Sequence, residues 1–403
     1  MLFFVLRLGL RSLAVARVIR SAVFVLALTG LADAQAASGD KVYFAGVAFT
    51  NEAASIQQTF PHTAASLSAA GSSMLNQSIR QQLQTQAAGL EVVFDALGSI
   101  KDSSKSTALA LGIDRESTSV EHIGSVYKLR VEITAEALFF DFKEKQVLGG
   151  FPFTIDFIDT SATPPTDDEI QKAYDGMVFG APGRHSLSSE FAATLAHVQI
   201  PNAANKHLRV TSATLGAKAI TYIQQADPQA EMSSIPAQIA DAFGKALAAN
   251  QHISILPYSS NQAIGSSMAA RFVEGEAFQL KIPDADYEIH LDVAGFKKVD
   301  QDHSAAETMY LYGAFVDVSV TEPLSGKIYF SQRIKQGVTK SVPLSQTTMD
   351  DWEPAHESLL ILFDNFTRAL TPGHSDWAKS ALPDTPEAKN QLISLSELVQ
   401  SCR

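Results

Sequence analysis

Cysteine is nearly absent from this sequence of 403 residues, whose one cysteine is Cys402, next to the carboxyl end. A single cysteine cannot form an internal disulfide, so the fold must be held together by its apolar cores. We expect Cys402 to be an incidental thiol on a frayed tail, or alternatively the site of an intermolecular bond. No cysteine follows the predicted export signal, which excludes a bacterial lipid anchor on a mature amino-terminal cysteine.

Long apolar runs are also missing beyond the first 36 residues. No later stretch reaches the roughly 18 apolar residues that indicate a membrane-spanning helix. Residues 1–36 resemble a secretory signal, with four arginines between positions 7 and 20, a short apolar run at 22–28, and the small residues Ala34 and Ala36. An amino-terminal membrane anchor is the alternative. We predict a signal peptide over 1–36, no later membrane span, and a periplasmic or secreted protein.

Positive charge is scarce. The chain has 31 lysines and arginines against 43 acidic residues, for a net charge of −12. Removal of residues 1–36 takes away four arginines and one aspartate, which makes the net charge −15. Nucleic acids and anionic membrane surfaces attract positive fields, so the charge balance disfavours both as partners.

Motifs for nucleophilic catalysis and phosphate binding are missing as well. The Gly-Ser-Ser-Met segments at 71–74 and 265–268 differ from the Gly-x-Ser-x-Gly nucleophile motif, and both are expected within or beside helices. The glycine-rich segment 176–185 lacks the lysine and the preceding strand of a phosphate-binding loop. We therefore expect a flexible loop between helices there, and we predict no catalytic residue and no cofactor.

Metal-binding spacing is equally weak. Asp300, Asp302 and His303 form a small acidic group without the glycine and distal glutamate of an EF-hand loop, and we expect a solvated hairpin tip. Trp352 and Trp377 could stack on a ligand, although core packing is favoured for Trp352. We predict no metal site. The other histidines lack metal-ligand spacing: His62, His122, His185, His197, His207, His252, His290, His356 and His374.

Two patterns recur 160 residues apart. Apolar side chains at 75, 79 and 83 mark one face of a helix, and the same spacing returns at 235, 239 and 243. The alternating segment 127–133 likewise returns at 287–293, with one apolar and one polar face. The shared offset predicts two related domains in tandem. Two turns, at 143–146 and 324–327, differ by 181 positions, which predicts about 21 added residues near 296–314.

The same patterns predict the remaining elements. We expect short helices at 106–111 and 262–272, a capping box at Thr166, a helix capped by Ser188 or Ser189, and one capped by Ser233 or Ser234. The predicted fold class is α+β, with two tandem domains that each contain a mixed β-sheet packed with helices. The boundaries are 37–203 for the first domain, 204–373 for the second, and 374–403 for a carboxyl-terminal helical tail.

The second half resembles a known class of envelope domain. Residues 285–293 begin with Ala-Asp-Tyr and continue as a strand, and residues 318–328 form a strand, a Ser-Gly-Lys turn and a return. This order resembles proteins with a TolB amino-terminal-type domain, including curli-secretion lipoproteins and lipoprotein activators of peptidoglycan synthases. The resemblance covers about 207–370, and more weakly 41–200. It implies an envelope accessory protein without shared catalytic residues, but the lipidated cysteine and the amphipathic stretches of a secretion pore are absent.

These observations favour an exported bacterial envelope protein with a non-catalytic accessory or scaffold role. Its expected partner is an envelope or secretion-associated protein, bound through sheet edges or the added loop. The alternative is an exported hydrolase or ligand-binding protein whose site lies between the two domains and draws on 300–303 and Arg184–His185. A secreted effector or adhesin is a third possibility.

Overall fold

The computed structural model describes residues 41–50, 56–68, 71–85, 90–94, 106–258, 267–272, 277–344, 349–374 and 376–403. Residues Gly39–Arg403 form one contiguous unit of the fold. The predicted signal peptide over 1–36, Gly89 as a predicted helix end, and positions 265–266 lie outside the described residues.

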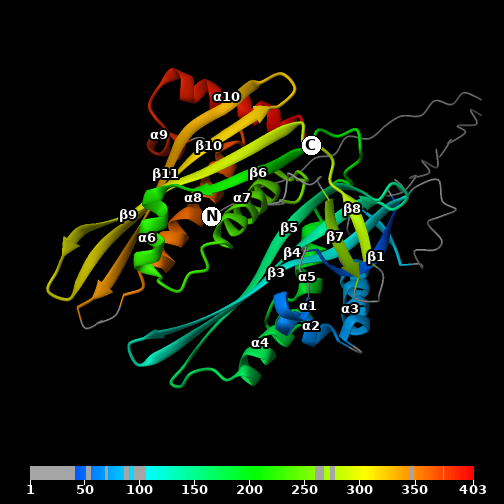
Figure 1. The fold of residues 1–403 in the computed structure, drawn as a ribbon, viewed down its shortest axis with the longest axis horizontal. Helices are drawn as coiled ribbons and strands as arrows, with labels where there is room; N and C mark the ends of the chain where they lie inside the picture. The colour runs from blue at the N-terminus through cyan, green and yellow to red at the C-terminus, as the bar shows by residue number, and fades with distance from the viewer. Residues whose placement is uncertain are drawn as a thin grey trace, which may run out of the picture. The chain divides into compact units, whose positions relative to one another are not determined.

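The fold is α+β, as predicted (Figure 1). Within the described residues, one mixed sheet has seven strands in the order β2-β1-β3-β4-β5-β8-β7, and a second has four in the order β11-β10-β9-β6. The strands are β1 (Lys41–Phe49), β2 (Glu91–Val93), β3 (Thr107–Ile123), β4 (Val126–Asp141), β5 (Gln146–Ser161), β6 (Leu208–Leu215), β7 (Ser267–Phe272), β8 (Ala277–Lys281), β9 (Tyr287–His303), β10 (Glu307–Glu322) and β11 (Lys327–Pro343).

Helices cover the sheets and contribute to both main cores. Those of the first half pack on the seven-stranded sheet, whereas α7 and α8 pack on the four-stranded sheet. They are α1 (Ile56–Thr59), α2 (Pro61–Leu67), α3 (Gly71–Thr85), α4 (Asp167–Phe179), α5 (Leu187–Leu195), α6 (Ala217–Ala226), α7 (Ile235–Gln251), α8 (Trp352–Ala369), α9 (Ala378–Ala381) and α10 (Pro386–Gln400). No helix among the described residues is both long and apolar enough to span a membrane.

The helical stripes predicted at 75–83 and 235–243 are confirmed. Leu75, Ile79 and Leu83 are buried on α3, and Ile239 and Phe243 are buried on α7. Residues at i, i+4 and i+8 lie on one helical face, so each stripe turns toward its own sheet. The spacing of apolar residues therefore determined where each of these helices packs.

Two predicted short helices are strands instead. Residues 107–111 begin β3, where Ala108 and Ala110 face a small core while Leu109 and Leu111 face the helix-covered core. Residues 267–272 form β7, which pairs with β8 and also with β1. Alanine and leucine favour helices locally, but the buried partners on both sides of β3 impose a strand.

The hairpin of β7 and β8 joins the first sheet although it comes from the sequence range of the second predicted domain. β8 pairs with β5 at Gln146 and Lys281, and β7 pairs with β1 at Phe49 and Arg271. The strands β1, β3, β4, β5, β8 and β7 thereby close into a ring at one end. Its interior is the small apolar core that contains Phe140 and Phe272.

The two sheets share the same connectivity. In each half, a first strand pairs in parallel with a later strand that begins a three-stranded antiparallel meander: β1 with β3–β5, and β6 with β9–β11. A bulge interrupts the first strand at Ala45 and at Thr211, and the next at Asp114 and at Ala294. Equivalent bulges on equivalent strands are what a duplicated domain would show, because bulges persist within families.

The bulges correct the predicted 160-residue alignment of the strands. Their spacing is 166 residues on the first strands and 180 on the next, so Tyr287 at the start of β9 corresponds to the start of β3. Tyr127 begins β4, a different strand of the meander. The added residues therefore precede β9, where β7 and β8 lie, and the predicted insertion near 296–314 is wrong. Two strands with the same alternation are indistinguishable in sequence without their pairing partners.

Helix caps were predicted with mixed success. Thr166 forms the predicted capping box with Glu169 on α4. The cap of α5 is Ser186, whereas Ser189 occupies the third helical position and completes its capping box. Ser234 precedes α7 as predicted, but its side chain makes no capping hydrogen bond.

The carboxyl end is not a frayed tail. Helix α10 packs against β11 and the second core, and Cys402 is only 4% exposed. Its thiol donates to the Leu398 carbonyl, 3.4 Å away, and burial raises the pKa of Cys402 to about 12. A buried, protonated thiol is a poor nucleophile, which also removes Cys402 as the site of an intermolecular disulfide.

Candidate functional site

A polar cleft lies between the first sheet and helices α7 and α8. Its volume is about 990 Å³. One wall is the polar face of β3, β4 and β5, and the other is formed by α7, α8 and the segment 226–231. The alternation predicted for β4 is confirmed, but its polar residues Lys128, Arg130 and Glu132 face this cleft rather than open solvent.

Two arginines on neighbouring strands share one carboxylate on the floor of the cleft. Arg115 of β3 donates to Glu132 Oε1 at 3.2 Å, and Arg130 of β4 donates to Oε2 of the same residue at 3.1 Å. Arg115 also donates to the Thr134 hydroxyl at 3.2 Å. Charge-assisted hydrogen bonds of this type fix the orientation of both guanidinium groups.

His356 of α8 lines the cleft near these arginines. Burial first, and then the positive charges of Arg130 and Arg115, lower the pKa of His356 to about 4. Its ring stacks on Trp352, with the centroids 5.3 Å apart, and Trp352 meets Phe296 edge to face at 5.4 Å. Trp352 therefore serves core packing, as predicted, and also lines the cleft.

Helix α7 presents charged residues to the same space. Burial raises the pKa of Asp241 to about 6, with Arg115 lowering it and Glu132 raising it. Burial lowers the pKa of Lys245, and the nearby carboxylates of Glu132 and Asp156 oppose that shift. The apolar stripe of α7 faces the second core, so these polar residues lie on its opposite side.

Three carboxylates surround one ammonium group in another part of the cleft. Lys128 pairs with Glu353 and lies 3.6 Å from Glu121. Asp350 accepts from the backbone amides of Trp352 and Glu353 at the start of α8. Burial, then hydrogen bonding and charge from Asp350, raises the pKa of Glu121 to about 7, while Lys128 opposes this shift.

The same three acids are the group within the described residues that could hold a metal ion. Carboxylate oxygens of Glu121, Asp350 and Glu353 lie within 4.8 Å of one another. The ammonium of Lys128 already pairs with two of these acids and supplies the positive charge that a cation would bring. The arrangement is therefore complete without a metal.

Lys128→Met is expected to lower the free energy of unfolding by about 1–3 kcal/mol, because it leaves half-buried carboxylates without a counter-charge. Calcium should restore part of this loss by binding the three acids. Urea unfolding with and without calcium would measure both effects. The matched control is Lys379→Met, which removes an exposed pair with Asp376 and should change nothing measurable. Equal behaviour of the two variants would contradict this account of Lys128.

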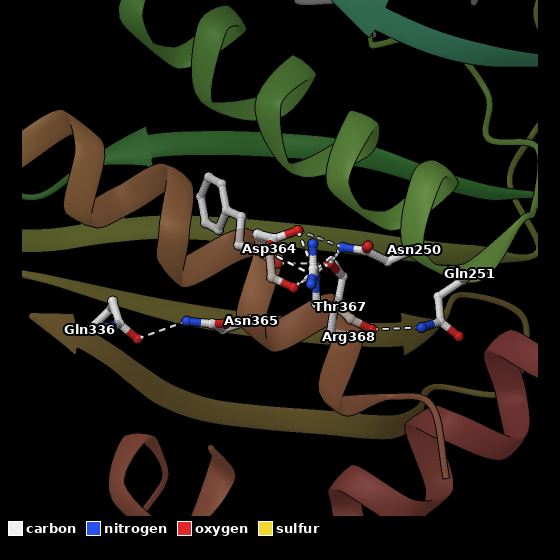
Figure 2. A network of polar contacts seen from close by, with 8 residues as sticks. Asn250, Gln251, Gln336, Asp364, Asn365, Thr367 and Arg368 are labelled. Carbon is white, nitrogen blue, oxygen red and sulfur yellow. Dashed lines mark hydrogen bonds and ion pairs between the residues drawn. The ribbon is translucent and has the colours of Figure 1, made fainter. Parts of the chain in front are cut away.

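Helices α7 and α8 are joined at one end by a polar network (Figure 2). The Asn250 amide donates to the Asp364 side chain at 3.0 Å and to the Thr367 hydroxyl at 2.9 Å. The Gln251 amide donates to the Thr367 carbonyl at 2.6 Å, in a buried position. Asn250 and Asp364 also line the cleft, so the network fixes the distance between two parts of its wall.

A buried acidic pair lies close to the cleft. Glu136 of β4 is 4% exposed and pairs in register with Gly112, and its side chain also occupies space that a Cβ at Gly150 would fill. Its Oε1 has no hydrogen-bond partner among the described residues. Burial, followed by Asp114 and Asp241, raises the pKa of Glu136 well above its usual range. Burial also raises the pKa of Asp114 to about 8, although Thr50 donates to its carboxylate.

The residues weighed in the sequence lie elsewhere. Asp300 and His303 are at the exposed end of β9, with side chains 63% and 64% exposed and 3.9 Å apart. Arg184 stacks over Phe157 at 3.9 Å, and His185 is 83% exposed beside Glu190, in the loop between α4 and α5. None of these five residues lines the cleft.

The Gly-Ser-Ser-Met segments have separate structural roles. Gly71 begins α3, and a Cβ there would lie 2.0 Å from the Ser66 carbonyl oxygen, so only glycine fits. Met268 lies in β7, which corrects the predicted helical setting of the second segment. Trp377 packs on Phe366 at 6.3 Å and donates to Gln336 at 2.7 Å, away from the cleft.

Sequence reasoning missed the cleft because its residues come from five separate elements. The alternation in β4 identified Lys128, Arg130 and Glu132 as one face, but nothing nearby in the sequence shows that α7 and α8 approach it. His356 was noted in the sequence only as a histidine without metal spacing. Its isolation on α8 gave no local signal of the two arginines.

No protein-family model matches this chain, and no curated protein matches it in sequence. Two solved structures are similar over less than half of it. A neuraminyllactose-binding hemagglutinin homolog from Helicobacter pylori is 11% identical, with 45% of this chain and 95% of that chain covered and a TM-score of 0.25. A minor lipoprotein from Acinetobacter baumannii is 13% identical, with 44% and 96% covered and a TM-score of 0.20.

Proposed function

We propose that this protein is an exported cell-envelope protein with a non-catalytic accessory role, and that it binds its partner or ligand in the polar cleft. The export signal predicted over 1–36 supports the location. The cleft of about 990 Å³ carries the binding role, because its charged side chains are mounted on strands and long helices and are oriented by one another. Rigidly supported polar groups in a concave site are typical of binding sites.

The geometry favours the cleft over partner binding at a sheet edge. The edge strand β11 carries Lys327, Arg333, Lys335 and Lys340, and lysines on edge strands discourage pairing with another chain. Gln391 of α10 also accepts a hydrogen bond from the Ser331 backbone amide at 2.9 Å. The tandem arrangement of related domains over 37–203 and 204–373 remains part of this proposal, with the shared connectivity of the two sheets as its support.

Site-specific crosslinking in cells tests the location of binding. A photoreactive amino acid would replace Ala249, an exposed residue of α7 that lines the cleft. The matched variant carries it at Ala305, an exposed residue of the turn between β9 and β10. Specific crosslinks from position 249 would support the cleft. Crosslinks from 305 alone, or from neither position, would overturn it.

The non-catalytic role has its own test. Material bound to the protein after purification from envelope extracts would be identified by mass spectrometry, before and after prolonged incubation with fresh protein. We expect the bound compound to be recovered unchanged. Its conversion to a product by this protein, but not by heat-denatured protein, would show an enzyme instead.

A further inference from the structure

We infer that the cleft recognises a carboxylate on its ligand through Arg115 and Arg130; this inference rests on the proposed binding function. The two guanidinium groups share the single carboxylate of Glu132, at 3.2 and 3.1 Å. Only the Nη2 atom of each arginine is used in these bonds. A guanidinium offers five N–H donors, so both groups keep donors for a further planar anion.

The unused donors are confirmed atom by atom. Nε of Arg115 and Nε of Arg130 are buried without a hydrogen-bond partner among the described residues. Buried arginine donors without acceptors are costly, and small side-chain movements that bring them onto a ligand carboxylate would remove that cost. Both arginines line the cleft, with side chains 24% and 33% exposed, so the guanidinium groups are reachable from it.

The surroundings of His356 show the same excess of positive charge. Its pKa is lowered by burial and by both arginines, and no carboxylate offsets their effect at that position. The neutral ring can donate one hydrogen bond without adding charge. A carboxylate placed between the two arginines and His356 would therefore find donors on both sides of the cleft.

The remaining charges limit the ligand to a single anionic group. Lys245 of α7 adds a positive charge, but Asp156 of β5 and Asp241 of α7 oppose it. The acids around Lys128 would repel a second negative group and would attract an amine. A zwitterion such as a short peptide, with its carboxylate at the arginines, fits this distribution better than a polyanion.

The pH dependence of binding follows from Asp241. Because burial raises its pKa to about 6, its carboxylate loses its negative charge as the pH falls through 6. The groups that face it are Arg115 and Glu132 on the sheet, and His356 across the cleft remains neutral down to about pH 4. Carboxylate binding is therefore expected to be tighter at pH 5.5 than at pH 7.5.

The test uses the full chain with isotope-labelled histidine, and follows the His356 ring resonances by NMR at pH 5.5. The probes are L-alanyl-L-alanine, its carboxyl amide and inorganic phosphate. We expect the dipeptide to shift the His356 signals, the amide to bind about tenfold more weakly or not at all, and phosphate to bind no better than the dipeptide. Equal binding of the dipeptide and its amide would overturn the inference.

Variants separate the arginines from general effects. Arg130→Gln should weaken dipeptide binding by about tenfold, whereas Arg333→Gln, which removes an exposed pair with Asp317 on the second sheet, should leave it unchanged. If Arg130→Gln does not fold, discrimination between dipeptide and amide by the unmodified protein decides the question. Specific crosslinks at position 249 without any shift at His356 would retain the proposed function and overturn the carboxylate inference. Absence of both signals would overturn both.

Discussion

Glu136→Gln is expected to stabilise the protein increasingly as the pH rises above 4.5. Glu136 is 4% exposed, and its pKa in the folded protein is raised by burial and by Asp114 and Asp241. In the unfolded chain the carboxyl ionises near its ordinary pKa of 4.5. Ionisation then favours the unfolded state, which glutamine does not do.

The sign and slope of this effect follow from proton linkage. Stability contributed by the protonated Glu136 is fully present below pH 4.5, and is lost as the pH rises toward the raised pKa of the folded state. Within that window the loss is about 1.4 kcal/mol per pH unit. The difference in unfolding free energy between Glu136→Gln and the unmodified protein should therefore grow by that amount per unit.

Urea unfolding at pH 4, 5.5 and 7 would measure the difference. Taking the difference removes the contribution of His356, whose lowered pKa makes the unmodified protein lose stability as the pH falls from 6.5 toward 4. Glu144→Gln, in the exposed turn between β4 and β5, is the matched control and should show no such growth. A pH-independent difference for Glu136→Gln would contradict a protonated, buried Glu136.

Phe366→Ala is expected to lower the free energy of unfolding by about 3–5 kcal/mol. The side chain is fully buried on α8 and touches three aromatic rings. Their centroids lie 5.2 Å away for Phe330 on β11, 6.1 Å for Phe243 on α7, and 6.3 Å for Trp377. Alanine would leave a cavity at the place where α7, α8 and the second sheet meet, and α8 cannot fill it without moving.

The same variant should disturb the cleft, because α8 also carries His356. Thermal unfolding would measure the stability loss, and the His356 NMR signals would report the movement of the helix. Leu324→Ala removes a side chain that is 97% exposed at the turn between β10 and β11, and should change neither quantity. A stability loss for Phe366→Ala no larger than for Leu324→Ala would contradict the central position of this ring.

The sequence predicted those parts of the fold that depend on local periodicity. The stripes on α3 and α7, the two faces of β4 and the Thr166 capping box each lie within about ten residues. Side-chain direction repeats every 3.6 residues in a helix and every two in a strand, so these patterns are legible without a structure.

Predictions that required a distant partner were wrong. Residues 107–111 and 267–272 form strands because β1, β4 and β8 lie beside them, and their alanine-rich sequence favours helix in isolation. Cys402 is buried because α10 packs on the second core, although chain ends are commonly frayed. In each case burial against residues far along the chain overrode the local preference.

The sequence by itself determined the α+β class, the faces of the main helices and strands, and the acidic character of the chain, because each depends on composition or short-range spacing. Only the tertiary structure decided what the polar face of β4 does. Packing of α7 and α8 opposite that face turns Arg115, Arg130 and Glu132 from surface residues into the floor of a cleft, and brings His356 to them. The charges gain their functional meaning from proximity in a partly desolvated space, which no pattern along the chain encodes.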